Sequence, residues 1–341
     1  MLRRDSPPHR VLPAPALGKA RRLQNHRVPM RDGVTLAIDV LLPPGEGPFP
    51  TILIRTPYNK NLKMTSPENS LRDRLLEAGY AYAVQDVRGR FNSEGEWRMY
   101  FAESEDGPDT IDWVVDQLWC DGNVGMCGGS YEAQDQWSAA MSGHPNLKAI
   151  APLASTTASL WDNEPIRGGA LLTQMAHYAV DMGLHSYQID DVREQMWARF
   201  EESSNVLPVA DVIGEENAQS PYFQEWTEHP TLDDFWRRGD FGRWDQMRTP
   251  ALHITGWWDM ALAGTLENFP AMVAGGATEE VREAQRMIIG PWPHWMNQER
   301  ELNGMHFGDG AIVAARSEFG LQSSSSTMPS LSASGKVHPM S

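Results

Sequence analysis

Cysteine is almost absent from this 341-residue sequence, which contains only Cys120 and Cys127. Two cysteines are too few for a disulfide scaffold, and neither has the further Cys or His neighbours of a zinc site. The histidines between His144 and His253 also lack the spacing of metal ligands. The sequence therefore argues against a disulfide-stabilised protein, and neither a metal nor another cofactor is expected.

Positive charge and long apolar runs are scarce as well. The chain has 29 Lys and Arg against 45 Asp and Glu, which gives a formal net charge of −16. Because nucleic acid and anionic membranes repel a negative surface, neither is expected as a partner. No stretch approaches the about 20 apolar residues that cross a bilayer, and the expected location is the cytoplasm. The sequence leaves open whether the chain forms a homo-oligomer.

The two ends of the chain differ from its body. The first 27 residues carry seven Lys and Arg but one acid, Asp5, and no apolar run follows the early arginines, as a secretory signal requires. We predict a disordered basic arm over residues 1–26; a misassigned start codon or an unusual targeting segment are the alternatives. The chain is polar and of low complexity from Ser323 onward, so a disordered or aberrant tail is predicted over residues 312–341.

The body of the chain is typical of a globular protein, with 41% apolar and 22% charged residues. Its length predicts two domains, or one large domain with an insertion. Between residues 27 and 156, segments with apolar side chains at every second position alternate with segments of helical spacing. Strands are predicted at 34–42, 51–55, 81–84, 124–129 and 148–153, and helices at 71–78, 110–118 and 132–141. This alternation predicts a parallel sheet with helices on both faces.

The alternation stops between residues 157 and 246, where strand-like runs are few. Helix formers with an apolar stripe at residues 171–182 and 189–200 predict a helical cap. Strands at 251–255 and 286–289 and a helix at 262–274 then resume the pattern within residues 247–311. The sequence therefore predicts one α/β domain, with parts at 27–156 and 247–311, that is interrupted by a cap at 157–246.

A serine lies at the most informative turn of this pattern. Gly128 and Gly129 follow a short apolar strand and precede Ser130, and a helical pattern begins immediately afterwards. Such a strand-to-helix turn strains the backbone, needs small neighbours and holds the serine hydroxyl above the sheet edge. The N–H of Tyr131, at the start of the helix, can then stabilise an oxyanion. The glycine usual two residues after the serine is replaced by Glu132.

Partners for this serine follow two later strands. A serine hydroxyl needs a base, and the base needs an acid to orient it, in the chain order serine, acid, histidine for this kind of turn. Asp259 follows the strand at 251–255, and His294 follows the strand at 286–289. Parallel α/β sheets place ligands at the carboxyl ends of their strands. We therefore predict that Ser130, Asp259 and His294 meet at one sheet edge.

The sequence resembles the cocaine-esterase and X-Pro dipeptidyl-peptidase group of serine hydrolases. The resemblance covers residues 27 to 310 and rests on seven stretches: Val28–Val34 (VPMRDGV), Arg55–Tyr58 (RTPY), Asp86–Arg90 (DVRGR), Trp119–Gly122 (WCDG), Gly128–Tyr131 (GGSY), Gly256–Asp259 (GWWD) and Gly290–His294 (GPWPH). It implies an α/β-hydrolase fold with a helical cap insertion. It also implies that Ser130 is the nucleophile, His294 the general base and Asp259 its orienting acid.

The resemblance adds one site residue that the chain alone does not indicate. It implies that the Tyr58 hydroxyl joins the Tyr131 N–H in the oxyanion hole, which is chemically reasonable because a phenol donates one hydrogen bond. Concave apolar walls bind bulky acyl groups, so four tryptophans are candidate substrate-binding residues: Trp161, Trp257, Trp258 and Trp292. A peptide substrate would need an acid for its amine, for which Glu132, Asp162 and Glu164 are candidates.

The sequence thus predicts a serine hydrolase that acts on a small-molecule ester, an amide or a short peptide through an acyl-enzyme. Two alternatives stay open. One is a true X-Pro dipeptidyl-peptidase. The other is a catalytically impaired fragment, because members of the resembled group continue beyond the histidine into a β-sandwich jelly-roll domain, whereas this chain ends 47 residues after His294.

Overall fold

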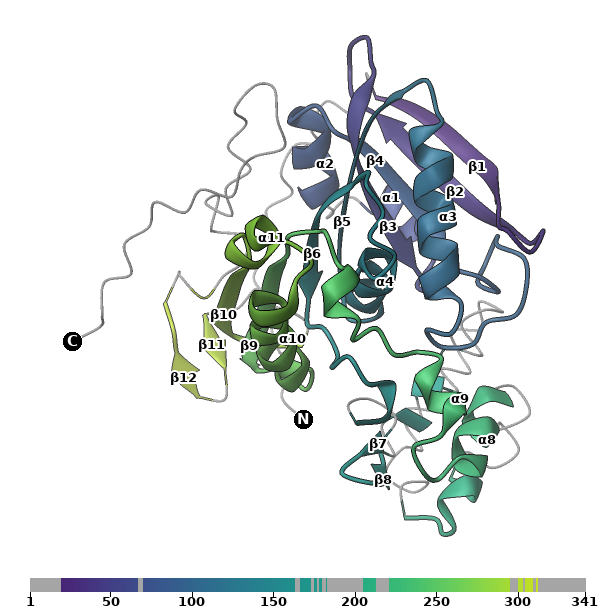
Figure 1. Cartoon of the computed structure of the whole chain (residues 1–341), viewed down its shortest axis with the longest axis vertical. Coiled ribbons are helices and arrows are strands. Elements are labelled where there is room, and N and C mark those ends of the chain that lie inside the picture. The colour runs from purple at the N-terminus through teal and green to yellow at the C-terminus, as the bar shows by residue number, and fades with distance from the viewer. Residues whose placement is uncertain are drawn as a thin grey trace, which may run out of the picture.

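The computed structural model describes residues 20–66, 70–162, 166–172, 175–176, 178–179, 182, 205–212, 221–294, 300–302, 304–308 and 311. Its centre is an eight-stranded sheet with the strand order β1-β2-β4-β3-β5-β6-β9-β10 (Figure 1). These strands are β1 (Arg21–Pro29), β2 (Thr35–Leu42), β3 (Phe49–Thr56), β4 (Ala81–Asp86), β5 (Cys120–Gly129), β6 (Leu147–Leu153), β9 (Leu252–Trp258) and β10 (Arg286–Pro293). The strands from β4 to β10 in this order are parallel, and β2 is antiparallel to both of its neighbours.

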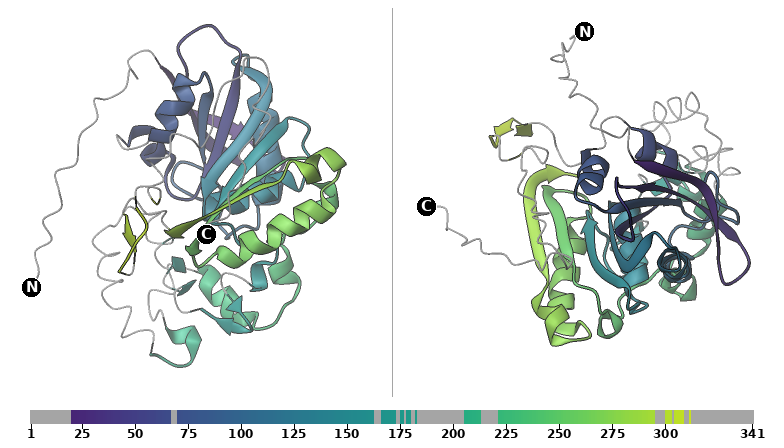
Figure 2. Two further views of the ribbon diagram at one scale, coloured as in Figure 1. Left: turned by 90° about the vertical axis from the view of Figure 1, so that its left-hand side faces the viewer. Right: turned by 90° about the horizontal axis from the view of Figure 1, so that it is seen from above.

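Helices cover both faces of the sheet (Figure 2). One face packs against α3 (Glu103–Val115), α4 (Tyr131–Ala140), α10 (Leu262–Gly275) and α11 (Glu279–Glu283), and the other against α1 (Lys60–Thr65) and α2 (Ser70–Glu77). The alternation within the strands explains this division, because successive side chains point to opposite faces. Val40 of β2, for example, packs in the core beneath α3 and α4, whereas Leu41 packs in the core beneath α1 and α2.

The predicted elements of the sheet are present, but the sheet begins earlier than expected. Residues 21–26, predicted as part of a disordered arm, lie in β1, which pairs antiparallel with β2 at one edge of the sheet. Arg22 of this strand forms an ion pair of 2.7 Å with the buried Asp39 of β2. Only Val28 of β1 is buried, so this strand lacks the alternation of apolar residues by which a half-buried strand is recognised. Residues 1–19 and 312–341 lie outside the described residues.

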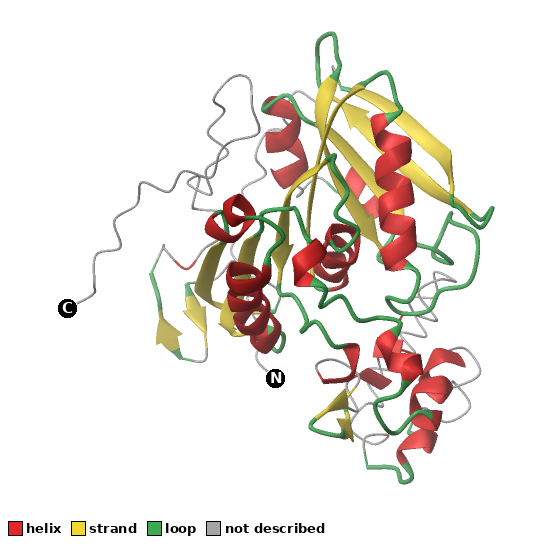
Figure 3. Cartoon of the chain, viewed as in Figure 1, coloured by secondary structure: helices red, strands yellow, loops and turns green. Residues whose placement is uncertain are grey.

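The described part of the predicted cap is mostly short helices and loops, with one pair of two-residue strands (Figure 3). It contains η2 (Leu160–Asp162), β7 (Ile166–Arg167), β8 (Ala170–Leu171), η3 (Val209–Asp211), α8 (Pro221–Glu228), α9 (Asp234–Arg237) and η5 (Trp244–Gln246). The predicted helix at 189–200 lies outside the described residues. A hairpin of β11 (Glu301–Leu302) and β12 (Met305–His306) follows the last strand of the main sheet.

An aromatic cluster joins this cap to the α/β part of the chain. Trp226 of α8 and Trp236 of α9 are buried in one core cluster with Trp97, Tyr100 and Tyr131. The last of these residues follows Ser130 directly, so the cap packs beside the predicted nucleophile. In Figure 1 the cap lies at one end of the strands of the main sheet. No described helix is long and apolar enough to span a bilayer.

Candidate active site

Ser130 lies on the turn between β5 and α4 with φ 60° and ψ −123°. Residues with a Cβ rarely adopt a positive φ. The turn is held from both sides, because the Ser130 N–H donates to the carbonyl of Leu153 at 2.9 Å and the Ser130 carbonyl accepts from the Ala133 N–H at 2.8 Å. The strained turn presents the hydroxyl at the carboxyl edge of the sheet, as the sequence predicts.

Gly128 allows this turn to close against α4. It has a φ of +141°, and a Cβ at this position would lie 2.5 Å from the Cβ of Glu132. Glu132 occupies that space and is itself buried. Its carboxylate forms an ion pair of 2.8 Å with Lys63 and accepts a hydrogen bond of 2.7 Å from the Thr56 hydroxyl. The acid that replaces the usual glycine therefore has polar partners on both sides.

The ends of β9 and β10 bring the predicted acid and base to this serine. The Nε2 atom of His294 lies 3.0 Å from the Oγ of Ser130, and its Nδ1 atom lies 2.8 Å from Oδ1 of Asp259. The three residues come from β5, β9 and β10, which all run in the same direction. The structure thus brings together Ser130, Asp259 and His294, which are separated by up to 164 positions in the chain.

The hydrogen bonds of Asp259 hold its carboxylate in a fixed orientation. The side chain of Asp259 is 2% exposed. Its Oδ1 also accepts from the Ala261 N–H at 2.8 Å, and its Oδ2 lies 3.4 Å from the Thr255 hydroxyl, which donates to it. Because a carboxylate only accepts hydrogen bonds, the hydrogen between the two residues sits on Nδ1 of His294. The Nε2 atom then has a lone pair that faces the serine hydroxyl.

Tyr131 and Tyr58 are the two donors predicted for an oxyanion hole. Tyr131 is the first residue of α4, and no described residue accepts a hydrogen bond from its N–H. Tyr58 follows the end of β3, the neighbour of β5 in the sheet. Its hydroxyl lies 3.3 Å from the hydroxyl of Tyr178 in the cap. The Tyr58 loop and the first turn of α4 therefore follow the carboxyl ends of two adjacent parallel strands, and the role of both donors stays a prediction.

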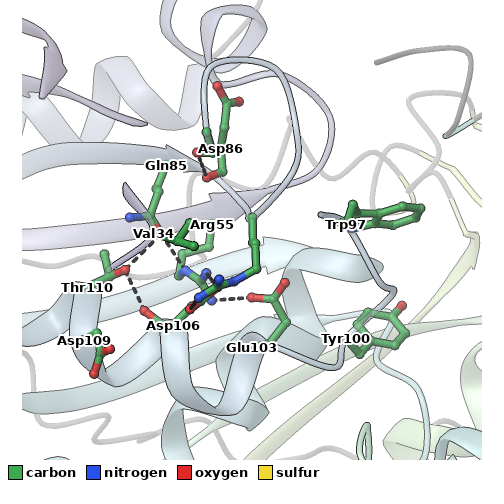
Figure 4. A network of polar contacts seen from close by, with 12 residues as sticks. Val34, Arg55, Gln85, Asp86, Trp97, Tyr100, Glu103, Asp106, Asp109 and Thr110 are labelled. Carbon is green, nitrogen blue, oxygen red and sulfur yellow. Dashed lines mark hydrogen bonds and ion pairs between the residues drawn. The ribbon is translucent and has the colours of Figure 1, made fainter. Parts of the chain in front are cut away.

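The side chain of Tyr131 is anchored in a buried polar network. Its hydroxyl donates to Glu103 at 2.8 Å and accepts from the Trp97 indole N–H at 3.1 Å. Glu103 also forms an ion pair with Arg55 of β3. Figure 4 shows Glu103 and Asp106 reaching from α3 toward Arg55. Burial raises the pKa of the Tyr131 phenol well above its usual range, so the phenol stays protonated. The anchored side chain fixes the position of the Tyr131 backbone N–H.

Two further titratable groups near the turn are held in their neutral forms. Burial, reinforced by the neighbouring charge of Glu103, raises the pKa of Asp135 well above its usual range. Neither of its carboxyl oxygens has a hydrogen-bond partner among the described residues. Burial likewise raises the pKa of the Cys127 thiol to about 12. Because the thiolate is the nucleophilic form, Cys127 does not compete with Ser130.

The four candidate pocket tryptophans have different surroundings. Trp257 and Trp258, which precede Asp259, are 58% and 38% exposed. Trp161 is partly buried and packs edge-to-face on Trp236 of the cap, at 5.5 Å between ring centroids. Trp292 is 1% exposed and donates to the carbonyl of Ala311 at 2.7 Å. Trp292 was predicted to line the pocket, but a side chain so enclosed packs against other core residues and does not contact a substrate.

Sequence reasoning missed several polar residues around the site. Lys63 and Tyr178 carry no motif of their own. Thr56 belongs to the RTPY stretch, but nothing in that stretch indicates its hydrogen bond with Glu132. Arg55 belongs to the RTPY stretch, and its role beneath Tyr131 is not visible from spacing. Among the described residues, no group of three or more His, Cys, Asp or Glu side chains could hold a metal ion.

Comparisons with known proteins found a matching family and a curated relative. Residues 32–296 match the model of the X-Pro dipeptidyl-peptidase (S15) family. The chain is similar to the cocaine esterase of Rhodococcus sp. strain MB1 Bresler, with 35% identity over 288 residues that make up 79% of this chain and 48% of the esterase. The chain thus spans about half the length of this curated relative.

Solved structures with related folds include two other hydrolases. An aminopeptidase from the marine sediment archaeon Thaumarchaeota archaeon superposes with a TM-score of 0.70 and 24% identity, over 89% of this chain and 54% of the aminopeptidase. An α-amino acid ester hydrolase superposes with a TM-score of 0.66 and 25% identity, over 86% of this chain and 52% of the hydrolase. The central sheet, its flanking helices and these likenesses confirm the expected α/β-hydrolase fold.

Proposed function

Because the chain belongs to the X-Pro dipeptidyl-peptidase (S15) family of serine hydrolases, we propose that it cleaves an ester or amide bond through an acyl-enzyme. One observation carries this proposal: the ring of His294 lies 3.0 Å from the Ser130 hydroxyl and 2.8 Å from the Asp259 carboxylate. A base within hydrogen-bond reach of a hydroxyl, and oriented by an acid, is the arrangement that activates a serine.

The proposed reaction begins with attack of the Ser130 Oγ on the substrate carbonyl. The Nε2 atom of His294 accepts the hydroxyl proton, and Asp259 stabilises the imidazolium that forms. His294 then donates this proton to the leaving alcohol or amine as the carbonyl reforms. Water, deprotonated by His294, hydrolyses the acyl-enzyme and regenerates the Ser130 hydroxyl. The same ring therefore serves as base and acid in both halves of the reaction.

Negative charge on the former carbonyl oxygen is stabilised by the Tyr131 N–H and the Tyr58 hydroxyl. The Tyr131 N–H is suited to this role because it lies at a helix N-terminus, where the dipole is positive. The phenol of Tyr58 adds a second donor from the adjacent loop. Trp161, Trp257 and Trp258 remain candidates for contacts with the acyl or leaving group.

We propose a small-molecule ester or amide as the first choice of substrate and an X-Pro peptide as the second. The relative with 35% identity is named a cocaine esterase, whereas the family description names X-Pro dipeptidyl-peptidase. A dipeptidyl-peptidase must bind the substrate ammonium. Of the acids considered for this, Glu132 is already paired with Lys63, Asp162 lies near the Gly168 N–H, and Glu164 lies outside the described residues. The ester is therefore the better-supported substrate.

Replacement of Ser130 by alanine tests the proposed function. Ser130→Ala is expected to abolish hydrolysis of a p-nitrophenyl ester and labelling by a fluorophosphonate, because both require the Oγ nucleophile. The matched control is Ser142→Ala, just after the other end of α4, where the hydroxyl donates to the carbonyl of Ala139. This control is expected to retain parental turnover and labelling.

The same assay separates the alternatives. Turnover of an X-Pro-anilide above that of the aryl ester would favour the peptidase. A soluble, folded parent chain that is not labelled would favour a catalytically impaired fragment. Full turnover by Ser130→Ala would contradict the assignment of the nucleophile.

A further inference from the structure

A short polar chain connects the helix after Ser130 to the loop that carries Tyr58. The Thr56 hydroxyl donates to Oε1 of Glu132 at 2.7 Å, and the same hydroxyl accepts from the backbone N–H of Tyr58 at 3.1 Å. Thr56 and Glu132 are both buried, at 0% and 3% exposure. They are 76 positions apart in the chain, so only the fold brings them together.

The direction of each hydrogen bond in this series follows from which groups can donate and which can only accept. A threonine hydroxyl has one hydrogen to donate and lone pairs that accept. The Glu132 carboxylate, which is paired with Lys63, can only accept. The Thr56 hydrogen therefore points at Glu132, and a lone pair of Thr56 faces the Tyr58 N–H. Without this carboxylate, the hydroxyl would be free to rotate.

The loop around Tyr58 is also held on the side away from the nucleophile helix. Arg90 donates from Nε to the carbonyl of Pro57 at 3.0 Å. The N–H of Lys60 donates to Oδ1 of Asp86 at 2.7 Å. Asp86 ends β4, and Arg90 lies in the loop that follows it. These two contacts fix the loop to the β4 side of the sheet, whereas Thr56 and Glu132 fix it to α4.

Both proposed oxyanion donors are thus tied to the first turn of α4. Tyr131, whose N–H is one donor, and Glu132 are consecutive in that turn. We propose that Thr56 and Glu132 are positioning residues, which set the Tyr58 hydroxyl at the correct distance from the Tyr131 N–H and Ser130. This inference rests on the proposed function. It assigns to the acid at the usual glycine position a role in the geometry of the oxyanion hole.

A double-mutant cycle between Thr56 and Tyr58 tests the proposal. Thr56→Val keeps the shape of the side chain and removes the hydroxyl. Loss of a whole oxyanion donor lowers kcat by about 100- to 1,000-fold, so Tyr58→Phe is expected in that range. A donor that is displaced but not lost should cost less, and we expect Thr56→Val to lower kcat by about 10- to 100-fold with KM within about threefold of the parent.

The combined variant gives the decisive result. Thr56→Val in the Tyr58→Phe background is expected to lower kcat by no more than about twofold further, because the group that Thr56 positions is already absent. Glu132→Met, which removes the acceptor at similar volume, should show the same dependence on Tyr58. Thr56→Ser keeps the hydroxyl and should stay within about threefold of the parental kcat.

Controls separate this role from general loss of structure. Rates are measured per serine titrated with a fluorophosphonate, so that unfolded molecules do not count. Thr51→Val makes the same substitution at the start of β3, where the hydroxyl has only contacts of 3.5 Å to Phe49 and Cys120. It is expected to leave kcat unchanged.

Two results would overturn the inference. One is a loss from Thr56→Val that is as large in the Tyr58→Phe background as in the parent, because Thr56 would then act through another group. The other is parental kcat in Thr56→Val. Either result with an inactive Ser130→Ala variant leaves the proposed function intact, whereas an active Ser130→Ala variant removes the proposed function itself.

Discussion

Ser130 combines a strained backbone with a hydroxyl that faces a base. A positive φ at a residue with a side chain costs about 1–3 kcal/mol and persists only where the surroundings hold it. Here the surroundings are the Leu153 carbonyl, the close contact of Gly128 with Glu132, and the buried Tyr131 side chain. One of these residues, Tyr131, also supplies a donor of the proposed oxyanion hole.

A substitution of Asp259 gives a prediction for a single residue. Asp259→Asn preserves the size of the side chain but brings an amide N–H into competition with the Nδ1–H of His294, so the ring adopts the wrong tautomer. Loss of this orientation lowers kcat by about 10⁴-fold in enzymes with the same triad. We expect a loss of that order in ester hydrolysis, with fluorophosphonate labelling slowed in parallel.

The thermal unfolding midpoint of Asp259→Asn supplies the control, because folding should be little changed by a substitution of equal size. A loss of activity below tenfold would show that Asp259 does not orient the base.

Some residues of the site could be predicted from sequence and others could not. The position of Ser130 on a glycine turn, and of Asp259 and His294 after later strands, follows from periodicity and chain order. Tyr58 required the family resemblance, because a lone tyrosine in a loop has no signature. Thr56 was not foreseeable, since its hydrogen bond to Glu132 depends on how far the Tyr58 loop lies from α4.

Some secondary-structure elements could likewise be predicted from sequence and others could not. The strands with alternating apolar residues were predicted to within a few residues, as for β2, expected at 34–42 and found at Thr35–Leu42. Apolar spacing indicates a helix at 110–118 and the acids before it indicate an earlier start; α3 spans Glu103–Val115, and Glu103 and Asp106 in its first turn are tied to Arg55 and Arg88. Contacts of this kind between distant elements leave no periodic trace in the sequence.

The packing of α10 on the chain after β6 gives a prediction for an element. A Cβ on Gly264 would lie 2.1 Å from the carbonyl oxygen of Ser155. Gly264→Ala should improve intrinsic helix propensity by about 1 kcal/mol, but the methyl group must push the helix away from a backbone that cannot yield. We expect the clash to dominate and the free energy of unfolding in urea to fall by about 1–3 kcal/mol.

The matched control for this prediction is Ala263→Ser, on the exposed side of the same turn, which should change stability by less than about 0.5 kcal/mol. A Gly264→Ala variant that is as stable as the parent, or more stable, would show that α10 is free to shift.

At the scale of the whole molecule, a buried histidine predicts how stability depends on pH. His253 of β9 packs between Trp137 and Phe269, with Nε2 3.0 Å from Oε1 of Gln285. Burial lowers the pKa of His253 to about 4, whereas an unfolded histidine has a pKa of about 6.5. The unfolded state therefore binds a proton first, so the stability that neutral His253 contributes is present above pH 6.5 and is lost as the pH falls toward 4.

Between pH 7 and pH 4.5 this single group should reduce the free energy of unfolding by about 2–3 kcal/mol. The variant His253→Gln retains a side-chain donor but does not titrate, so its stability should fall less over the same interval. Urea unfolding at several pH values measures both curves. Parallel curves for parent and variant would contradict the role of His253.

The cap insertion separates the serine from its base along the chain. Ser130 precedes the cap, and His294 follows β10, which among the described residues lies at the edge of the sheet and pairs with β9 alone. The ribosome must therefore synthesise Ser130, the whole cap and the last two strands of the sheet before the imidazole of His294 can contact the Ser130 hydroxyl. Until β10 pairs with β9 in the sheet, the Ser130 hydroxyl of the growing polypeptide has no base beside it and is unreactive.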